Sequence, residues 1–390
     1  MRLTKKLQPL APASLLVMAA SFGAPALSQP AAQPGAIPAT ELHGGIEISP
    51  LAVRSIAVRI SNGDEGYNVK LLFSHSTDPP TAPPIRDGRL TPEYIREVSQ
   101  AVQKQFLRLR EQFHAPGPQI HIIGLADLVA RNLDELGSEI LNRTGRPINF
   151  IDAVTDTELC IAGIIPRRYQ AGNKIYDNRS ISMLVDLAGA NLRGGYQQIK
   201  RQAAGAPEYE FVTWEAPRGS STFTAEVARA AGEAASISAF ASRARALSAA
   251  SIRPLIQNEL AKRPAMQGRK KIYLTGDIIW AMMTLLHPDR HDPYLAVSMT
   301  DIDTFYNRAV IDPESLLNPD LSKIPDENLR DEMRRAREAI KATFPPKSLI
   351  AGAEMLKALA AELQFENKRV LYPRFSGYAR ILSYVRLEGQ

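Results

Sequence analysis

The chain has 390 residues, of which 45% are hydrophobic, and its formal net charge is +6. This length exceeds what one compact core ordinarily supports and predicts two domains of ordinary size. The positive charge is small and partly lies in the first residues, so it permits an anionic ligand but excludes the concentrated basic stripe that nucleic-acid binding requires.

The N-terminal residues are typical of a secretory signal. A basic start precedes an apolar run and a small-residue cleavage site: Arg2, Lys5 and Lys6, then Leu15–Phe22, then Ala26 and Ser28. We therefore expect a signal peptide over residues 1–28, a disordered Ala/Pro/Gln linker over 29–44, and a periplasmic or secreted protein. The single cysteine, Cys160, favours a bacterial periplasm. A signal that is kept as an anchor remains open, although the apolar run is short for a membrane span.

The first half of the mature chain alternates strand and helix patterns. We predict three antiparallel strands, then helix, strand, helix, strand and helix: the strands within Gly45–Ser76, then Thr91–Phe113, Gln119–Gly124, Ala126–Arg143, Pro147–Ile151 and Thr155–Ile164.

The second half begins with strands again and becomes largely helical. The expected elements are strands within Ser180–Tyr196 and Glu208–Trp214, a long helical region Phe223–Leu260, a strand Lys271–Leu274, a helix Asp277–Leu286, helices within Met299–Gln364, and a last strand and helix within Lys368–Val385. This repeated order is that of the actin and sugar-kinase superfamily, an α/β fold of two related domains that close on a phosphate. We predict the domains over 45–168 and 169–390, the second with a helical C-terminal extension.

Two strand–turn–strand segments each carry a carboxylate near the turn. In Ser182–Gly195 an apolar strand ends at Asp186, and in Gly44–Val58 the corresponding carboxylate is Glu47. Such turns bring backbone N–H groups to a phosphate beside a metal-binding carboxylate. The alternative, that both are ordinary amphipathic hairpins, stays open from these segments alone.

The segment Ile122–Ile164 carries a more specific pattern. Its strand and helix are followed by Thr144-Gly145, an apolar strand, and Asp156-Thr-Glu-Leu-Cys-Ile-Ala-Gly163. This block resembles the exopolyphosphatase/guanosine pentaphosphate phosphohydrolase (Ppx/GppA) family, and the resemblance extends over roughly Ile46–Trp280.

The resemblance implies hydrolysis of a terminal phosphoryl group by in-line attack of water, with Mg²⁺ on carboxylates and phosphates held by Gly-rich turns. Carried over residue by residue, it assigns Asp156 as the base and Glu47 and Asp186 to the metal. It assigns phosphate binding to Gly189, Asn191 and Gly276, and we add Arg193 to these residues because its guanidinium would attract a phosphate.

The polar positions depart from the family pattern. Pro50 removes a backbone donor from the first turn, Ser49 stands where the family has glycine, and Thr155 takes one of two expected Glu positions. Arg193 replaces a carboxylate, and the arginine expected at a helix start is absent.

These departures favour a catalytically degenerate protein that binds an anion such as phosphate or polyphosphate, or that interacts with a protein. The alternative is an active Mg²⁺-dependent phosphohydrolase that releases terminal phosphate from polyphosphate or guanosine pentaphosphate. We expect no nucleic-acid partner and no stable membrane insertion, and leave a homodimer or another protein partner open.

Overall fold

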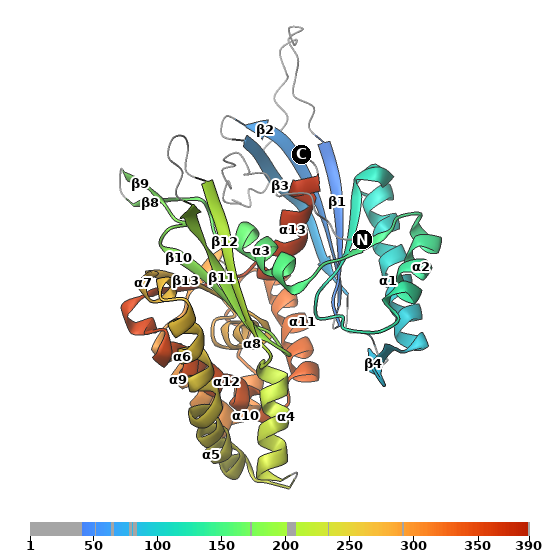
Figure 1. The fold of residues 1–390 in the computed structure, drawn as a ribbon. Coiled ribbons are helices and arrows are strands. Elements are labelled where there is room, and N and C mark those ends of the chain that lie inside the picture. Colours follow the sequence, from blue (N-terminus) through green and yellow to red (C-terminus); the bar gives the residue numbers. More distant parts are fainter. Residues whose placement is uncertain are drawn as a thin grey trace. The chain divides into compact units, whose positions relative to one another are not determined.

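The computed structural model describes residues 41–50, 52–63, 66–77, 80, 84–171, 174–200, 208–232, 234–290 and 292–388. The expected signal peptide lies outside these residues. The chain divides into two compact units, which we describe separately (Figure 1). The first unit contains the chain up to Leu159, Pro166–Tyr169 and the C-terminal segment from Tyr378; the second contains Cys160–Ile165 and Gln170–Gly377.

The first unit is built on one mixed sheet with the strand order β3-β2-β1-β6-β7. Strands β1, β2 and β3 are antiparallel neighbours, whereas β6 runs parallel to both β1 and β7. Its elements are β1 (Glu41–Ile48), β2 (Val53–Gly63), β3 (Gly66–Ser76), β4 (Ile85–Arg86), β5 (Arg89–Leu90), α1 (Pro92–Glu111), β6 (Ile120–Gly124), α2 (Leu133–Thr144), β7 (Ile148–Phe150), the start of α3 (Ala153–Ile164) and most of α13 (Ser376–Glu388).

Helices cover both faces of this sheet. The apolar side of α1, with Val98, Val102 and Phe106, packs with Ile46 and Ile48 of β1. On the other face, α13 lies so close to β1 that a Cβ atom on Gly45 would come within 2.5 Å of the Ile381 side chain. Two helical layers therefore bury β1 from His43 to Ile48, including the polar side chains of His43 and Glu47.

The strands and α1 confirm the sequence predictions for this unit, but two boundaries differ. Strand β1 begins at Glu41, inside the expected linker. Helix α2 begins at Leu133 rather than near Ala126. The Asn132 side chain accepts a hydrogen bond from the Leu90 amide and donates one to the Leu90 carbonyl. This tertiary contact holds the preceding turn out of the helix, although the apolar spacing continues through it.

The second unit has a six-stranded sheet with the order β12-β11-β10-β13-β15-β14 and a large helical layer. Its elements are β8 (Arg168–Ala171), β9 (Lys174–Asp177), β10 (Ser182–Leu187), β11 (Leu192–Lys200), β12 (Glu208–Ala216), α4 (Ser220–Ala231), α5 (Ile237–Leu247), α6 (Arg253–Lys262), α7 (Ala265–Gly268), β13 (Lys271–Thr275), α8 (Asp277–Leu286), β14 (Tyr294–Ala296), α9 (Met299–Ile311), α10 (Pro313–Leu317), α11 (Glu327–Thr343), α12 (Pro346–Glu362) and β15 (Arg369–Pro373).

Strands β10, β13 and β15 are parallel, so their carboxyl ends share one edge of the sheet. Helix α12 lies at the centre of the helical layer and is buried along most of its length. A Cβ atom on its Gly352 would lie 2.3 Å from the Ile278 side chain of α8, so this glycine permits close helix packing.

The long helical region expected over Phe223–Leu260 is divided. Helix α4 stops at Gly232, whose φ of 87° ends the helix, and Ser236 caps the start of α5. A π-helical turn, Ser248–Ile252, then joins α5 to α6. The alanine-rich composition predicts helix throughout, but one glycine and one cap divide it.

The division into units differs from the expected boundaries at the C-terminus. The chain crosses between units around residues 160–170, close to the predicted boundary at 168/169, but α13 returns to the first unit from Tyr378 onward. Its apolar residues Ile381 and Val385 pack on the first sheet, which is why it belongs there. None of the helices among the described residues is long and apolar enough to cross a membrane.

Candidate functional site

The first unit holds Glu47 in the fully buried part of β1. Its side chain is 0% exposed, and its Oε1 atom accepts a hydrogen bond from Arg54 Nη1 at 2.9 Å. Arg54 stands directly opposite in the register of β1 and β2. The second oxygen, Oε2, is buried without a hydrogen-bond partner. Burial raises the pKa of Glu47, and the neighbouring Asp156 carboxylate adds to the increase, while Arg54 and Arg380 oppose it.

Asp156 lies in the first turn of α3 and is also fully buried. Its Oδ1 atom accepts a hydrogen bond from Arg380 Nε of α13. Glu47 and Asp156 thus belong to one cluster of charged groups in the first unit, together with Arg54 and Arg380. Each carboxylate, however, faces an arginine that the sequence did not point to.

The turn after β1 is closed by its own hydrogen bonds. The Ala52 amide donates to Ser49 Oγ at 3.1 Å, and the Ser49 amide donates to the Ala52 carbonyl at 3.0 Å. The Tyr94 hydroxyl donates to the Ser49 carbonyl at 3.0 Å. The amides of Ser49 and Ala52, two of the backbone donors that a phosphate-binding turn needs, are therefore used within the turn. A third donor is absent because Pro50 has no amide hydrogen.

The second unit holds Asp186 at the carboxyl end of β10. Arg193 Nε of β11 donates to Asp186 Oδ2 at 3.0 Å, and Thr275 Oγ1 of β13 donates to Asp186 Oδ1 at 2.9 Å. Both partners stand opposite Asp186 in the strand registers. The Asp186 and Arg193 side chains are 4% and 2% exposed. This is a buried ion pair, completed by a hydroxyl group.

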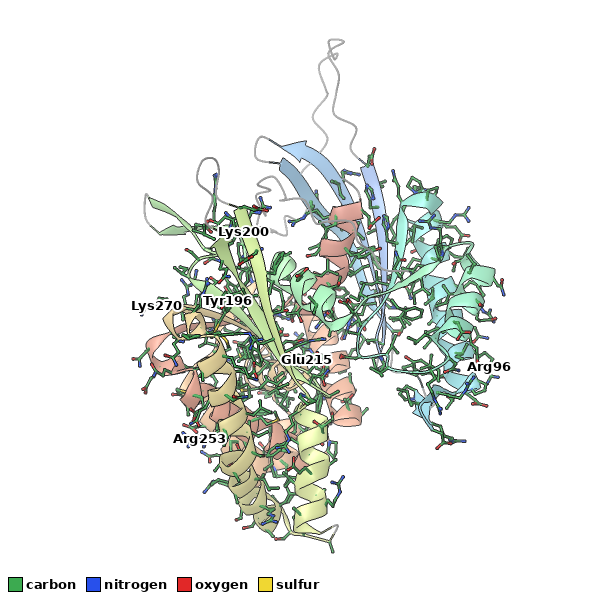
Figure 2. The ribbon with its side chains drawn as sticks, viewed as in Figure 1. Arg96, Tyr196, Lys200, Glu215, Arg253 and Lys270 are labelled. Atoms are coloured by element: carbon green, nitrogen blue, oxygen red, sulfur yellow. The ribbon has the colours of Figure 1, made fainter. Side chains whose placement is uncertain are left out.

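The turn of residues 188–191 is occupied by the start of α4. The amides of Ser220 and Ser221 donate to the carbonyls of Ala188 and Gly189, at 3.0 and 2.8 Å. Thus the helix N-terminus, which could otherwise bind an anion, binds the chain's own carbonyl groups. Asn191 donates to Glu215, a residue labelled in Figure 2.

The two glycines assigned to phosphate binding have structural roles. Gly276 has a φ of 113°, and a Cβ atom there would lie 2.1 Å from the Leu187 carbonyl oxygen. A Cβ atom on Gly189 would lie 3.1 Å from Ser221 Oγ and 3.8 Å from Asp277 Oδ2. The space that each glycine leaves is therefore used by other atoms of the chain, near Leu187 and Ser221, and not by a phosphate.

The donor set does not fit a Mg²⁺ ion. Among the described residues, no group of three or more His, Cys, Asp or Glu side chains is arranged to hold a metal. A divalent ion at Glu47, Asp156 or Asp186 would also have to displace, or approach, a guanidinium that already contacts that carboxylate.

Arg54, Arg380 and Thr275 are the site residues that sequence reasoning missed. The alternation of β2, paired with that of β1, could have placed Arg54 opposite Glu47. No local signal connects Asp156 with Arg380, because 224 positions separate them.

Comparison with known proteins shows the fold. No protein-family model matches the chain, and no curated protein matches it. The Ppx/GppA family member from Aquifex aeolicus has a TM-score of 0.56 at 14% identity, covering 90% of this chain and 100% of that chain. An exopolyphosphatase from Cytophaga hutchinsonii gives 0.55 at 12% identity, covering 90% and 98%. An exopolyphosphatase-like protein gives 0.57 at 12% identity, covering 89% and 99%. The chain shares the two-domain, actin-like α/β fold of these proteins, which confirms the predicted fold class and the resemblance.

Proposed function

We propose that this protein is an exported, catalytically inactive protein of the Ppx/GppA type that acts as a binding module. One observation carries the proposal. Each carboxylate expected to bind metal or activate water is held by an arginine of the same chain: Glu47 by Arg54, Asp156 by Arg380, and Asp186 by Arg193.

An arginine beside the expected base works against catalysis. A general base needs an oxygen that is available to accept a proton, and Asp156 Oδ1 already accepts a hydrogen bond from Arg380 Nε. The self-closed turn at Ser49 removes further phosphate donors, and loss of one transition-state donor alone typically costs about 10²–10³-fold in rate. Several such losses together leave little turnover, even though their effects do not add simply.

The surroundings of Arg193 favour a protein partner over an anion bound at the second turn. The Arg193 guanidinium is buried and committed to Asp186. The turn itself lies near two further acidic side chains, Asp277 and Glu215. An anion there would meet negative charge and carbonyl oxygens, so we place the binding function elsewhere on the molecule.

Turnover is tested by phosphate release from polyphosphate and guanosine pentaphosphate with Mg²⁺, using mature protein purified from the periplasm. We expect the rate to equal that of the Asp156→Ala variant. A Mg²⁺-dependent rate that Asp156→Ala or Asp186→Ala abolishes would restore the alternative, an active phosphohydrolase.

Export is tested separately. The basic start, apolar run and small-residue site motivate the proposal. Mass spectrometry of the periplasmic fraction should detect an N-terminus near Gln29. Intact protein beginning at Met1 and confined to the cytoplasm would refute export.

A further inference from the structure

Five basic residues gather at one end of the second unit's sheet: Arg269, Lys270, Lys271, Lys368 and Arg369. We call them the basic cluster. They lie where the neighbouring parallel strands β13 and β15 begin, and Lys271 stands opposite Arg369 in the register. This end is opposite to the Asp186 turn, about 13 Å away along β13, because Thr275 lies four residue steps after Lys271. Figure 2 labels Lys270 here and Glu215 at the other end.

The cluster has a buried floor and an exposed rim. Lys271 and Arg269 are 5% and 6% exposed, whereas Lys270 and Arg369 are exposed at the surface. The floor residues donate to neutral oxygens. Lys271 Nζ donates to Asn178 Oδ1 at 2.7 Å, and Arg269 Nη1 donates to the carbonyls of Arg179 and Ser180 at 2.8 and 2.6 Å.

Like charges repel each other within the cluster. Burial, with a smaller contribution from Arg369, lowers the pKa of Lys271 to about 8. Burial also lowers the pKa of Lys368, with a contribution from Lys270. Because the repulsion arises from positive charge concentrated on two adjacent strands, a negatively charged ligand would relieve it.

The acidic residues on flanking elements are largely committed to other cations. Asp177 pairs with Arg179 and accepts a hydrogen bond from Tyr209. Glu259 pairs with Lys262 and Arg263. Glu366 is exposed, lies two positions before Lys368 in the chain, and offsets part of the charge. The cluster therefore keeps a net positive charge at the surface.

We infer that the basic cluster is the docking site for an acidic segment of a partner protein. This inference rests on the proposed role as a binding module and names its partner by chemistry. Lys270 and Arg369 are exposed at the ends of two hydrogen-bonded strands, which lie about 4.8 Å apart. Cations at this spacing can pair with successive carboxylates of an acidic segment. The neighbouring Arg179 guanidinium lies 3.5 Å from the Tyr209 ring centroid, and arginine and tyrosine are enriched in protein interfaces.

The floor of the cluster disfavours a single compact phosphate. Phosphate sites converge backbone N–H groups on one anion, but the backbone groups that face these cations are carbonyls, of Arg179, Ser180 and Met266. A phosphate seated on the floor would meet carbonyl oxygens. An extended acidic segment can instead contact Lys270 and Arg369, which are exposed at the surface.

The test is binding of a fluorescein-labelled deca-glutamate peptide to the full mature protein, measured by fluorescence anisotropy. The cluster variant is K270E/R369E. The matched control is R96E/K104E, which makes the same charge change at two exposed residues of α1 in the first unit. Unchanged tryptophan fluorescence establishes that the second unit of each variant is folded.

We expect the cluster variant to bind the peptide at least about tenfold more weakly and the control within about twofold of the wild type. Equal affinity in the two variants would overturn the inference. So would binding of tripolyphosphate, or of phosphatidylglycerol vesicles, at the cluster without binding of the peptide. Turnover in the phosphate-release assay together with peptide binding at the cluster would refute the proposed inactivity and leave the docking site standing.

Discussion

The Asp186–Arg193 pair provides the sharpest test of the structure. The substitution Arg193→Leu removes the guanidinium and leaves the Asp186 carboxylate in an interior where the side chain is 4% exposed. Thr275 still donates one hydrogen bond at 2.9 Å, but a hydroxyl group does not replace a full positive charge. The buried carboxylate must then be protonated or partly hydrated, and both cost free energy.

The expected loss is about 3–5 kcal/mol in the free energy of unfolding, the range observed when one partner of a buried pair is removed. The single variant Asp186→Leu should lose a similar free energy of unfolding, because it leaves the Arg193 guanidinium buried without its carboxylate. Replacing both residues with apolar ones, Asp186→Leu with Arg193→Met, should cost no more than about 1 kcal/mol. The sum of the two single losses then exceeds the loss in the double variant by about 5 kcal/mol or more.

Urea denaturation followed by tryptophan fluorescence measures the free energy of unfolding of the second unit, which contains the Asp186–Arg193 pair. The chain has two tryptophans, Trp214 and Trp280, and both belong to the second unit. The signal therefore reports this unit even if the first unfolds separately. An unchanged dependence on urea concentration would show that the denatured state is the same in all variants.

A loss below about 1 kcal/mol for Arg193→Leu, the value for an exposed ion pair, would contradict the buried pair. So would a double variant that loses as much stability as the two single variants together. Either result would mean that Asp186 does not depend on Arg193, and the carboxylate would then be available to a metal.

Three further predictions concern other parts of the chain. Burial, with contributions from His43 and Arg146, lowers the pKa of His121 from 6.5 to about 4. The neutral imidazole therefore contributes its full stabilisation to the first unit above pH 6.5, and the free energy of unfolding falls by about 2–3 kcal/mol as the pH decreases to 4. The variant His121→Leu should remove this loss in urea titrations followed by circular dichroism. Gly276→Ala should destabilise the second unit by more than about 2 kcal/mol, measured by tryptophan fluorescence, because its φ is 113° and Leu187 blocks the Cβ position, whereas Gly268→Ala, with nothing within 4 Å, should be neutral. Millimolar Mg²⁺ should leave the melting temperature unchanged, and a rise that Asp186→Ala abolishes would contradict the arginine-paired site.

Much of the fold could be predicted because its signals are local. Alternation of apolar residues marks β1, β2 and β3, and Thr91 with Pro92 marks the start of α1, where the Thr91 side chain caps the helix. The repeated order of elements then indicated the actin-like fold. The start of α2 could not be read in this way, because a side chain distant in sequence, Asn132 bound to Leu90, decides it.

The candidate site likewise combines features that are local in the sequence with contacts between residues that are distant in the sequence. The pattern along the chain locates the carboxylates at strand ends and helix starts, and it puts Pro50 and Arg193 where the family pattern has other residues. The contacts of those carboxylates depend on the folded structure. Arg380 reaches Asp156 because α13 returns to the first unit, and the turn at Gly189 is closed because α4 begins against it. The physical reason is that a charge is neutralised by whatever folds beside it, and that neighbour is fixed by packing rather than by spacing along the chain.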